Sequence, residues 1–161
     1  METIVIASDH AGIALKEDLK DFLKRKKFEP LDMGTDGEDS VDYPDYGILV
    51  AEMVSRGEVD RGILICGTGI GMSIVANKFR RVRAALVSDV QSARMAKEHN
   101  DANILVIGSR VVNPLIVRDM VSEWLFADFG GGRHQQRLDK IFEIEDRMIK
   151  GYPTQKDTKE R

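Results

Sequence analysis

The sequence predicts an α/β fold, a three-layer α/β/α domain built on a five-stranded parallel sheet. Short and nearly continuous apolar runs recur along the chain, as expected for strands that are buried on both faces of a sheet. Amphipathic segments of helical period separate these runs. Such an alternation is typical of Rossmann-like domains, in which helices cover both faces of one parallel sheet.

Five apolar runs are the predicted strands. Four of them consist mainly of Ile, Val, Leu and Ala. The remaining run contains Pro30, which suits a short edge strand because proline cannot donate a hydrogen bond to a neighbouring strand. The expected strands cover residues 3–7, 29–32, 62–66, 84–87 and 104–107.

Six amphipathic segments are the predicted helices. Pro44 suits the first turn of the second helix, and the preceding stretch 33–42 is rich in Gly, Asp and Ser, which indicates a loop. The expected helices are a first one ending at 24–27, then 43–56, one that begins at 70 and runs through 79, 90–99, 114–127, and a last one containing 138–149. We expect residues 1–150 to form a single domain and the polar stretch 151–161 to be a disordered tail.

Composition excludes several classes of protein. A chain of 161 residues with 42% hydrophobic content can bury one sizeable core. The formal net charge of −3 argues against a nucleic-acid-binding surface, and no apolar stretch is long enough to span a bilayer. The N-terminus shows no signal-peptide pattern, and a single cysteine cannot form an intrachain disulfide. We therefore expect a cytoplasmic protein.

The stretch 62–73 concentrates the chemistry of the chain. An apolar strand runs into Cys66, the only cysteine, and alternating glycines at 67, 69 and 71 mark a tight turn into a helix that begins at Ile70. Glycines allow positive φ and a close approach of the backbone to a ligand, while the N–H groups of the first helical turn favour an anion. The same positive helix end favours a thiolate, so Cys66 is a candidate base or nucleophile.

Two other interpretations of this stretch stay open. A lone cysteine in a protein of this kind is more often a small buried hydrophobe than a catalyst. The glycines also resemble a dinucleotide fingerprint, and Asp89 stands about where a ribose-binding acid belongs. The fingerprint would need glycine at position 72, where the chain has Met72, so a nucleotide site is weakened without being eliminated.

Polar residues follow three of the predicted strands. They are Asp9-His10, the turn from Cys66 to Gly71, and Ser88-Asp89. Ligands of open parallel sheets gather at the carboxyl ends of the strands. From this pattern alone, Asp9-His10 is as well explained by a structural cap as by a function.

Several ordered motifs together resemble one family. They are Asp9-His10, Asp42-Tyr43-Pro44, residues 62–71, Ala76-Asn77-Lys78, His99-Asn100-Asp101, Gly108-Ser109-Arg110 and the stretch 131–137. In these motifs the chain is similar to the type B ribose-5-phosphate isomerases, a family that also contains isomerases of six-carbon sugar phosphates. The resemblance covers the whole chain except the tail.

This resemblance implies the interconversion of ribose 5-phosphate and ribulose 5-phosphate in the pentose phosphate pathway, without a metal or a cofactor. Cys66 resembles the base that moves a proton between C2 and C1 through an enediolate. The amides of the turn from Gly67 through Thr68, Gly69 and Ile70 to Gly71 would hold the enediolate oxygens. Some members of the family lack the cysteine and carry a glutamate at this turn. In this chain the cysteine is present and Met72 cannot ionise, so Cys66 is the sole obvious base.

The resemblance also assigns ring opening and phosphate binding. His99 resembles the acid that opens the sugar ring, assisted by Asp9 and Thr68, and Asn100 resembles a ligand of a sugar hydroxyl. The phosphate is implied to bind four basic side chains, His10, Arg110, Arg133 and Arg137. The spacing of Arg133 and Arg137 gives independent support, because residues four apart share one helical face. Two exposed surface arginines are the alternative.

Strand direction predicts that the site is shared between two chains. Cys66 follows its strand, whereas His99 precedes the strand 104–107 and so belongs at the opposite edge of the sheet. About five residues at ~3.3 Å each separate those edges, too far for both side chains to meet one sugar. We therefore expect a homodimer, or a dimer of dimers, with sites at the interface. The alternatives to a ribose-5-phosphate isomerase are an isomerase of a six-carbon sugar phosphate, such as allose 6-phosphate or galactose 6-phosphate, and a non-catalytic sugar-phosphate-binding subunit.

Overall fold

The computed structural model describes residues 1–151. The chain divides into two compact units, Met1–Phe129 and a second that begins at Gly130, and each is described by itself. The single domain expected over 1–150 stays a prediction. The predicted tail 151–161 lies, apart from Gly151, outside the described residues.

The first unit contains a five-stranded sheet in which every pairing is parallel, as predicted. The strand order is β2-β1-β3-β5-β4, so the Pro30 strand lies at an edge. The strands are β1 Thr3–Ser8, β2 Glu29–Asp32, β3 Arg61–Cys66, β4 Ala84–Leu86 and β5 Ile104–Gly108.

The helices lie close to their predicted positions. They are α1 Ile13–Arg25, α2 Tyr43–Arg56, α3 Ile70–Ala76, α4 Val90–Asn100, α5 Val117–Phe126 and α6 Arg133–Lys150, with 3₁₀ turns η1 His10–Gly12 and η2 Pro114–Ile116. The prediction that the third helix runs through Phe79 is wrong. The amide of Asn77 donates to the carbonyls of Ser73 and Ala84 and accepts from the N–H of Ala84, which ends α3 and directs the chain into β4.

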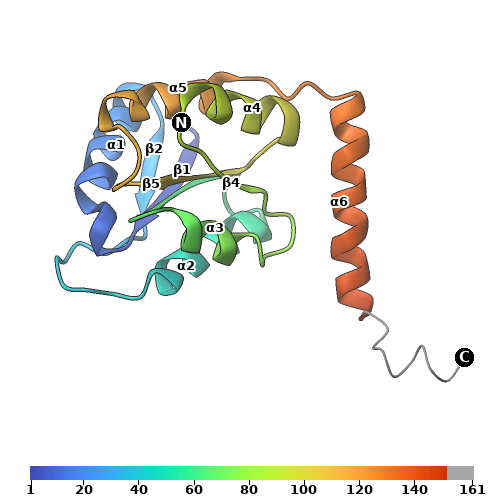
Figure 1. Ribbon diagram of the computed structural model, residues 1–161, viewed down its shortest axis with the longest axis horizontal. Helices are drawn as coiled ribbons and strands as arrows, with labels where there is room; N and C mark the ends of the chain where they lie inside the picture. Colours follow the sequence, from blue (N-terminus) through green and yellow to red (C-terminus); the bar gives the residue numbers. More distant parts are fainter. Residues whose placement is uncertain (152–161) are drawn as a thin grey trace, which may run out of the picture. The chain divides into compact units, whose positions relative to one another are not determined.

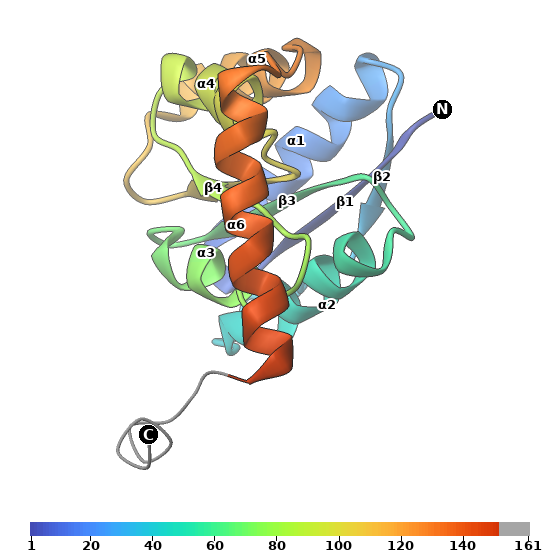
Figure 2. The same cartoon turned by 90° about the vertical axis from the view of Figure 1, so that its right-hand side faces the viewer.

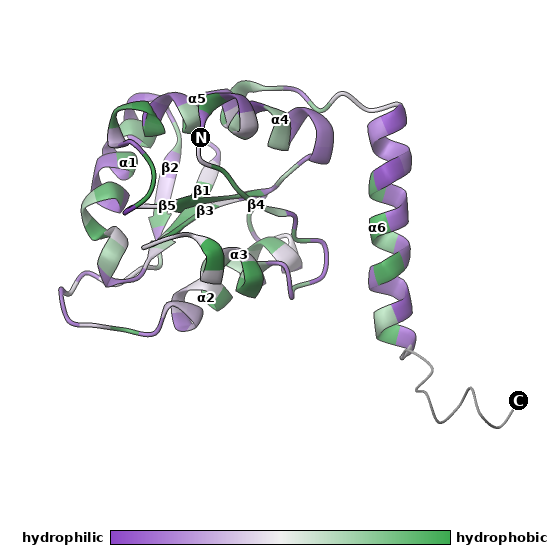
Figure 3. Cartoon of the chain, in the orientation of Figure 1, coloured by the Kyte–Doolittle hydropathy of each residue, from purple (hydrophilic) through white to green (hydrophobic). Residues whose placement is uncertain are grey.

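Helices cover both faces of the sheet. Figures 1 and 2 show α1, α4 and α5 on one face and α2 and α3 on the other. Two separate hydrophobic clusters fill the layers, and β3 serves both, because Ile63 and Ile65 enter one while Leu64 and Cys66 enter the other. The apolar colouring of β3 and β5 in Figure 3 follows from this double burial.

The second unit, as far as Gly151, contains the helix α6. Its sequence places Ile141, Ile144 and Met148 along one side, and Figure 3 shows apolar and polar residues alternating around it. An apolar stripe at this spacing is typical of a helix that packs along one face.

Candidate active site at the carboxyl ends of the strands

The parallel register aligns three strand ends. Ser8 pairs with Ile65, and Cys66 pairs with Gly108. The N–H of Asp9 continues this ladder by donating to the carbonyl of Ile65 at 3.3 Å. Asp9, Cys66 and Gly108 therefore lie side by side, and neighbouring strands are roughly 4.8 Å apart.

Cys66 lies at the base of a tight turn. The residue is 4% exposed, and its Sγ accepts a hydrogen bond from the N–H of Gly69 at 3.2 Å. Gly69 has φ of +78°, and a Cβ there would lie 2.5 Å from Cδ1 of Leu86. Only glycine fits this position, and its backbone donor is thereby held against the sulfur. A donor at this place stabilises negative charge on the sulfur.

Asp9 and His10 form the neighbouring turn. Asp9 is 6% exposed, and its Oδ1 accepts from the N–H of Ala11 at 2.9 Å, which caps η1. Nδ1 of His10 accepts from the N–H of Val41 at 3.1 Å. When the ring is neutral, its proton therefore resides on Nε2, which is the nitrogen left for a ligand.

The structure brings Thr68 and Arg110 to the same turn. Oγ1 of Thr68 accepts from the N–H of Ile70 at 3.3 Å, at the start of α3. The N–H of Arg110 donates to the carbonyl of Gly67, and a Cβ at Gly67 would lie 3.4 Å from Nη1 of Arg110. The guanidinium therefore lies over the glycine turn.

Two residues at the site were given no role in the sequence analysis. The ring of Tyr43 lies so close to Gly71 that a Cβ there would be 2.4 Å from Cζ of the ring. The Oγ of Ser109 donates to the carbonyls of Ala11 at 2.8 Å and Cys66 at 3.2 Å, which joins η1 to the end of β3. Both residues belong to motifs that carried the resemblance, and that was the available signal.

The structure does not bring His99 to Cys66 within one chain. His99 lies in the last turn of α4, which ends at Asn100. Soon afterwards the carbonyl of Asn103 accepts from the N–H of Gly62, near the amino end of β3. Cys66 follows Gly62 by four residues of strand, or roughly 13 Å. His99 therefore lies at the amino ends of the strands and Cys66 at their carboxyl ends.

Two of the three predicted phosphate arginines, Arg133 and Arg137, belong to the second unit. Arg133 is the first residue of α6, and Arg137 follows one turn later, so both occupy one face at its N-terminal end. Both are exposed within the chain.

The residues behind the alternative nucleotide site have structural roles. Asp89 caps α4 by accepting from the N–H of Ser92 at 2.7 Å. Met72 is fully buried in the core between α2, α3 and the sheet. These contacts explain both residues without a dinucleotide.

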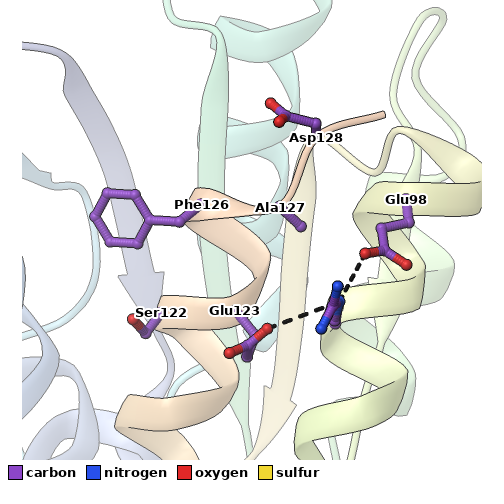
Figure 4. A pocket seen from close by; sticks show the side chains of 7 residues that line it. Glu98, Ser122, Glu123, Phe126, Ala127 and Asp128 are labelled. Carbon is purple, nitrogen blue, oxygen red and sulfur yellow. Dashed lines mark hydrogen bonds and ion pairs between the residues drawn. The ribbon is translucent and has the colours of Figure 1, made fainter. Parts of the chain in front are cut away.

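A separate pocket of about 400 Å³ lies between α4 and α5 (Figure 4). Arg94 contacts Glu98 at 2.6 Å and Glu123 at 3.9 Å across it. The cavity contains none of the predicted site residues. Its carboxylates are partly neutralised by Arg94, which also ties α4 to α5.

Comparison with known proteins identifies the family. The family model described as ribose/galactose isomerase matches residues 4–141, most of the chain. The chain belongs to the ribose/galactose isomerase family. The prediction from the motifs is thereby confirmed at the level of the family.

Similar members include proteins of known structure. The chain is 46% identical to ribose-5-phosphate isomerase B of Escherichia coli over 147 residues, 91% of this chain and 99% of that protein. The structure of ribose-5-phosphate isomerase B of Clostridium thermocellum is 55% identical, with a TM-score of 0.87 over 89% of this chain and 97% of that one. That of Mycoplasma genitalium, solved with bound ribulose 5-phosphate, is 44% identical, with a TM-score of 0.87 over 89% and 96% of the two chains.

Two features are absent from residues 1–151. No helix in this part of the chain is long and apolar enough to cross a membrane. In the same residues, no three His, Cys, Asp or Glu side chains are grouped so that they could hold a metal ion.

Proposed function

We propose that this protein interconverts ribose 5-phosphate and ribulose 5-phosphate. The observation that carries the proposal is the alignment of Asp9, Cys66 and the glycine turn at one sheet edge, in a chain that belongs to the ribose/galactose isomerase family. The Mycoplasma genitalium relative with bound ribulose 5-phosphate supports a five-carbon sugar. The single cysteine is consistent with a protein of the reducing cytoplasm.

Proton transfer is proposed to begin at Cys66. Its thiolate removes the proton from C2 of the open-chain aldose, and the electron pair of that C–H bond forms a C1–C2 double bond as negative charge moves to O1. The amides of the turn from Gly67 to Gly71 stabilise this enediolate. The proton of the O2 hydroxyl moves to O1, and the thiol returns its proton to C1 as O2 becomes the ketone oxygen, so the reaction needs neither an oxidant nor a reductant.

Ring opening is proposed to precede that transfer. His99 of a neighbouring chain gives a proton to the ring oxygen, while the carboxylate of Asp9, assisted by Thr68, accepts the proton of the anomeric hydroxyl. Asn100 holds a sugar hydroxyl. The phosphate contacts Nε2 of His10 and the guanidinium groups of Arg110, Arg133 and Arg137.

We further propose that two chains associate so that His99 of one meets Cys66 of the other. The separation of these residues across β3 supports this arrangement. Exposed apolar side chains next to the glycine turn also support it, since Ile70, Ile74 and Leu86 are 54%, 56% and 43% exposed in the single chain. Apolar surface of this kind marks protein interfaces.

A substrate panel tests the function. The purified protein is assayed with ribose 5-phosphate, allose 6-phosphate and galactose 6-phosphate, with and without a chelator, and the Cys66→Ala variant controls for contaminating isomerases. We expect the highest kcat/KM for ribose 5-phosphate, unchanged by the chelator. Preference for a six-carbon sugar phosphate would correct the substrate. No turnover of any sugar would favour a binding subunit.

A further inference from the structure

A fully buried lysine lies outside the proposed catalytic site. Lys16, on α1, is 1% exposed, and its Nζ donates to Oδ1 and Oδ2 of Asp32 at 2.8 and 2.7 Å. Lys20 donates to the same Oδ2 at 2.7 Å from a more exposed position. Lysine is almost never fully buried unless it is paired, and Asp32 is the partner here. The question is what this buried ion pair holds in place.

The ion pair anchors the start of the loop 33–42. Oδ1 of Asp32 accepts from the N–H of Gly34 at 2.9 Å, and the next residue, Thr35, donates its N–H to the carbonyl of Ser8 at 3.1 Å. Gly34 is packed tightly, since a Cβ there would lie 2.6 Å from the backbone nitrogen of Ser8 and 3.1 Å from Cδ of Lys16. Lys16 thus holds the loop through its charge and through its aliphatic stem.

The other end of the same loop holds His10. The N–H of Val41 donates to Nδ1 of His10 at 3.1 Å, and this bond fixes both the ring and its tautomer. The start of the loop lies against Ser8, two residues before His10. The loop therefore connects the two groups, because its start is held by the buried ion pair and its end is bonded to the imidazole of His10.

We propose that Lys16 and Asp32 are positioning residues that hold the imidazole of His10 toward the substrate phosphate through the loop 33–42. This inference rests on the proposed role of His10 in phosphate binding. Lys16 and Asp32 touch no substrate themselves.

The charges around the pair fit a positioning role. Although burial opposes ionisation, hydrogen bonds from Lys16, Lys20 and the N–H of Gly34 lower the pKa of Asp32. The carboxylate thus keeps its acceptor for Gly34. A buried ion pair contributes little net stability compared with apolar residues of the same size, so its consequence is expected in the geometry of the loop.

Lys16→Met tests the proposal, with Lys20→Met as the matched control. Methionine keeps the apolar stem against Gly34 and removes the charge, while Lys20→Met removes the more exposed partner of the same carboxylate. We expect Lys16→Met to raise KM for ribose 5-phosphate, and the inhibition constant of inorganic phosphate, by about five- to ten-fold, with kcat changed less than about two-fold. Lys20→Met should change each constant less than about two-fold.

A double-mutant cycle with His10→Ala separates positioning from general destabilisation. If Lys16 acts through His10, Lys16→Met adds less than about two-fold to either constant once the imidazole is gone. Gly34→Ala keeps both charged side chains while its Cβ displaces the loop, and it should raise the same two constants. That variant keeps the test decisive if Lys16→Met does not fold.

Three results would overturn the proposal. The first is that Lys16→Met or Gly34→Ala folds and leaves both constants unchanged while His10→Ala raises them. The second is that Lys16→Met raises them as much without His10 as with it. The third is that His10→Ala alone leaves phosphate inhibition unchanged, which would show that the proposed role of His10 itself is wrong.

Discussion

The backbone N–H of Gly69 lies 3.2 Å from Sγ of Cys66. This contact places a fixed donor on the candidate base, at a glycine that no other residue can replace without strain. A thiolate is stabilised by such a donor, and it is the thiolate that accepts protons from carbon acids.

Cys66→Ala should therefore abolish isomerisation, because residues 67–73 of the turn carry no acidic or basic side chain that could replace the thiolate. Phosphate inhibition constants cannot be measured in a dead variant, so binding of inorganic phosphate is followed by calorimetry and should stay near its native value. Exchange of the C2 proton with deuterated solvent is the direct readout. Substantial exchange in Cys66→Ala would show that another group is the base.

Gly69→Ala should damage both activity and stability. The native φ of +78° and the 2.5 Å approach of a Cβ to Leu86 add strain to a clash. We expect a loss of at least about 2 kcal/mol in the free energy of unfolding and of about ten-fold or more in kcat. Gly57→Ala is the control, because Gly57 has φ of +72° with nothing within 4 Å, and it should show strain without loss of kcat. Equal losses in both variants would contradict the special role of the turn.

Arg137→Ala should weaken substrate binding by about 2–3 kcal/mol if the guanidinium meets the phosphate in a partly desolvated site. Arg137→Lys should lose less, since the charge remains while the two-pronged geometry is lost. Arg147→Ala, on the same helix, is the control, because Arg147 is 67% exposed and contacts Glu143 at 3.6 Å. The steady-state KM and the inhibition constant of phosphate measure the effect. If Arg137→Ala and Arg147→Ala have equal constants, Arg137 is a surface residue without a role in binding.

The lowered pKa of Asp32 predicts a loss of stability in acid. The hydrogen bonds from Lys16 and Lys20 outweigh its burial, so the carboxylate stabilises the fold above its unfolded pKa of about 3.9. This contribution is lost as the pH falls through the lower pKa of the folded protein. Urea unfolding is measured between about pH 5 and pH 3. As the pH falls, the free energy of unfolding should decline more steeply for the wild-type protein than for Asp32→Asn. An unchanged slope would mean that Asp32 is not coupled to folding in this way.

The sequence predicts best what is local. The turn at Cys66 is a strand, alternating glycines and a helix start within twelve residues, and the structure has these elements where the pattern places them. The end of α3 could not be predicted, because Asn77 ends it through bonds to Ala84 on the next strand. Hydrophobic periodicity alone continues past such a stop.

Contacts between residues far apart in the chain could not be predicted either, because hydrophobic periodicity reports only local structure. The bond from Val41 to His10 joins residues 31 positions apart, and Lys16 meets Asp32 across 16 positions. Neither pair has a spacing that signals a contact. The resemblance supplied the roles of His99 and the arginines, whereas strand direction alone indicated that His99 and Cys66 lie at opposite edges.

Mixing two inactive variants tests the shared site most directly. Cys66→Ala and His99→Asn chains are unfolded together in equal amounts and refolded, and hybrid formation is confirmed by native mass spectrometry. Random pairing makes half of the dimers hybrids, each with one intact site of two, so about a quarter of the native activity should return. No recovery in a mixture that contains the hybrids would show that His99 and Cys66 do not act across two chains.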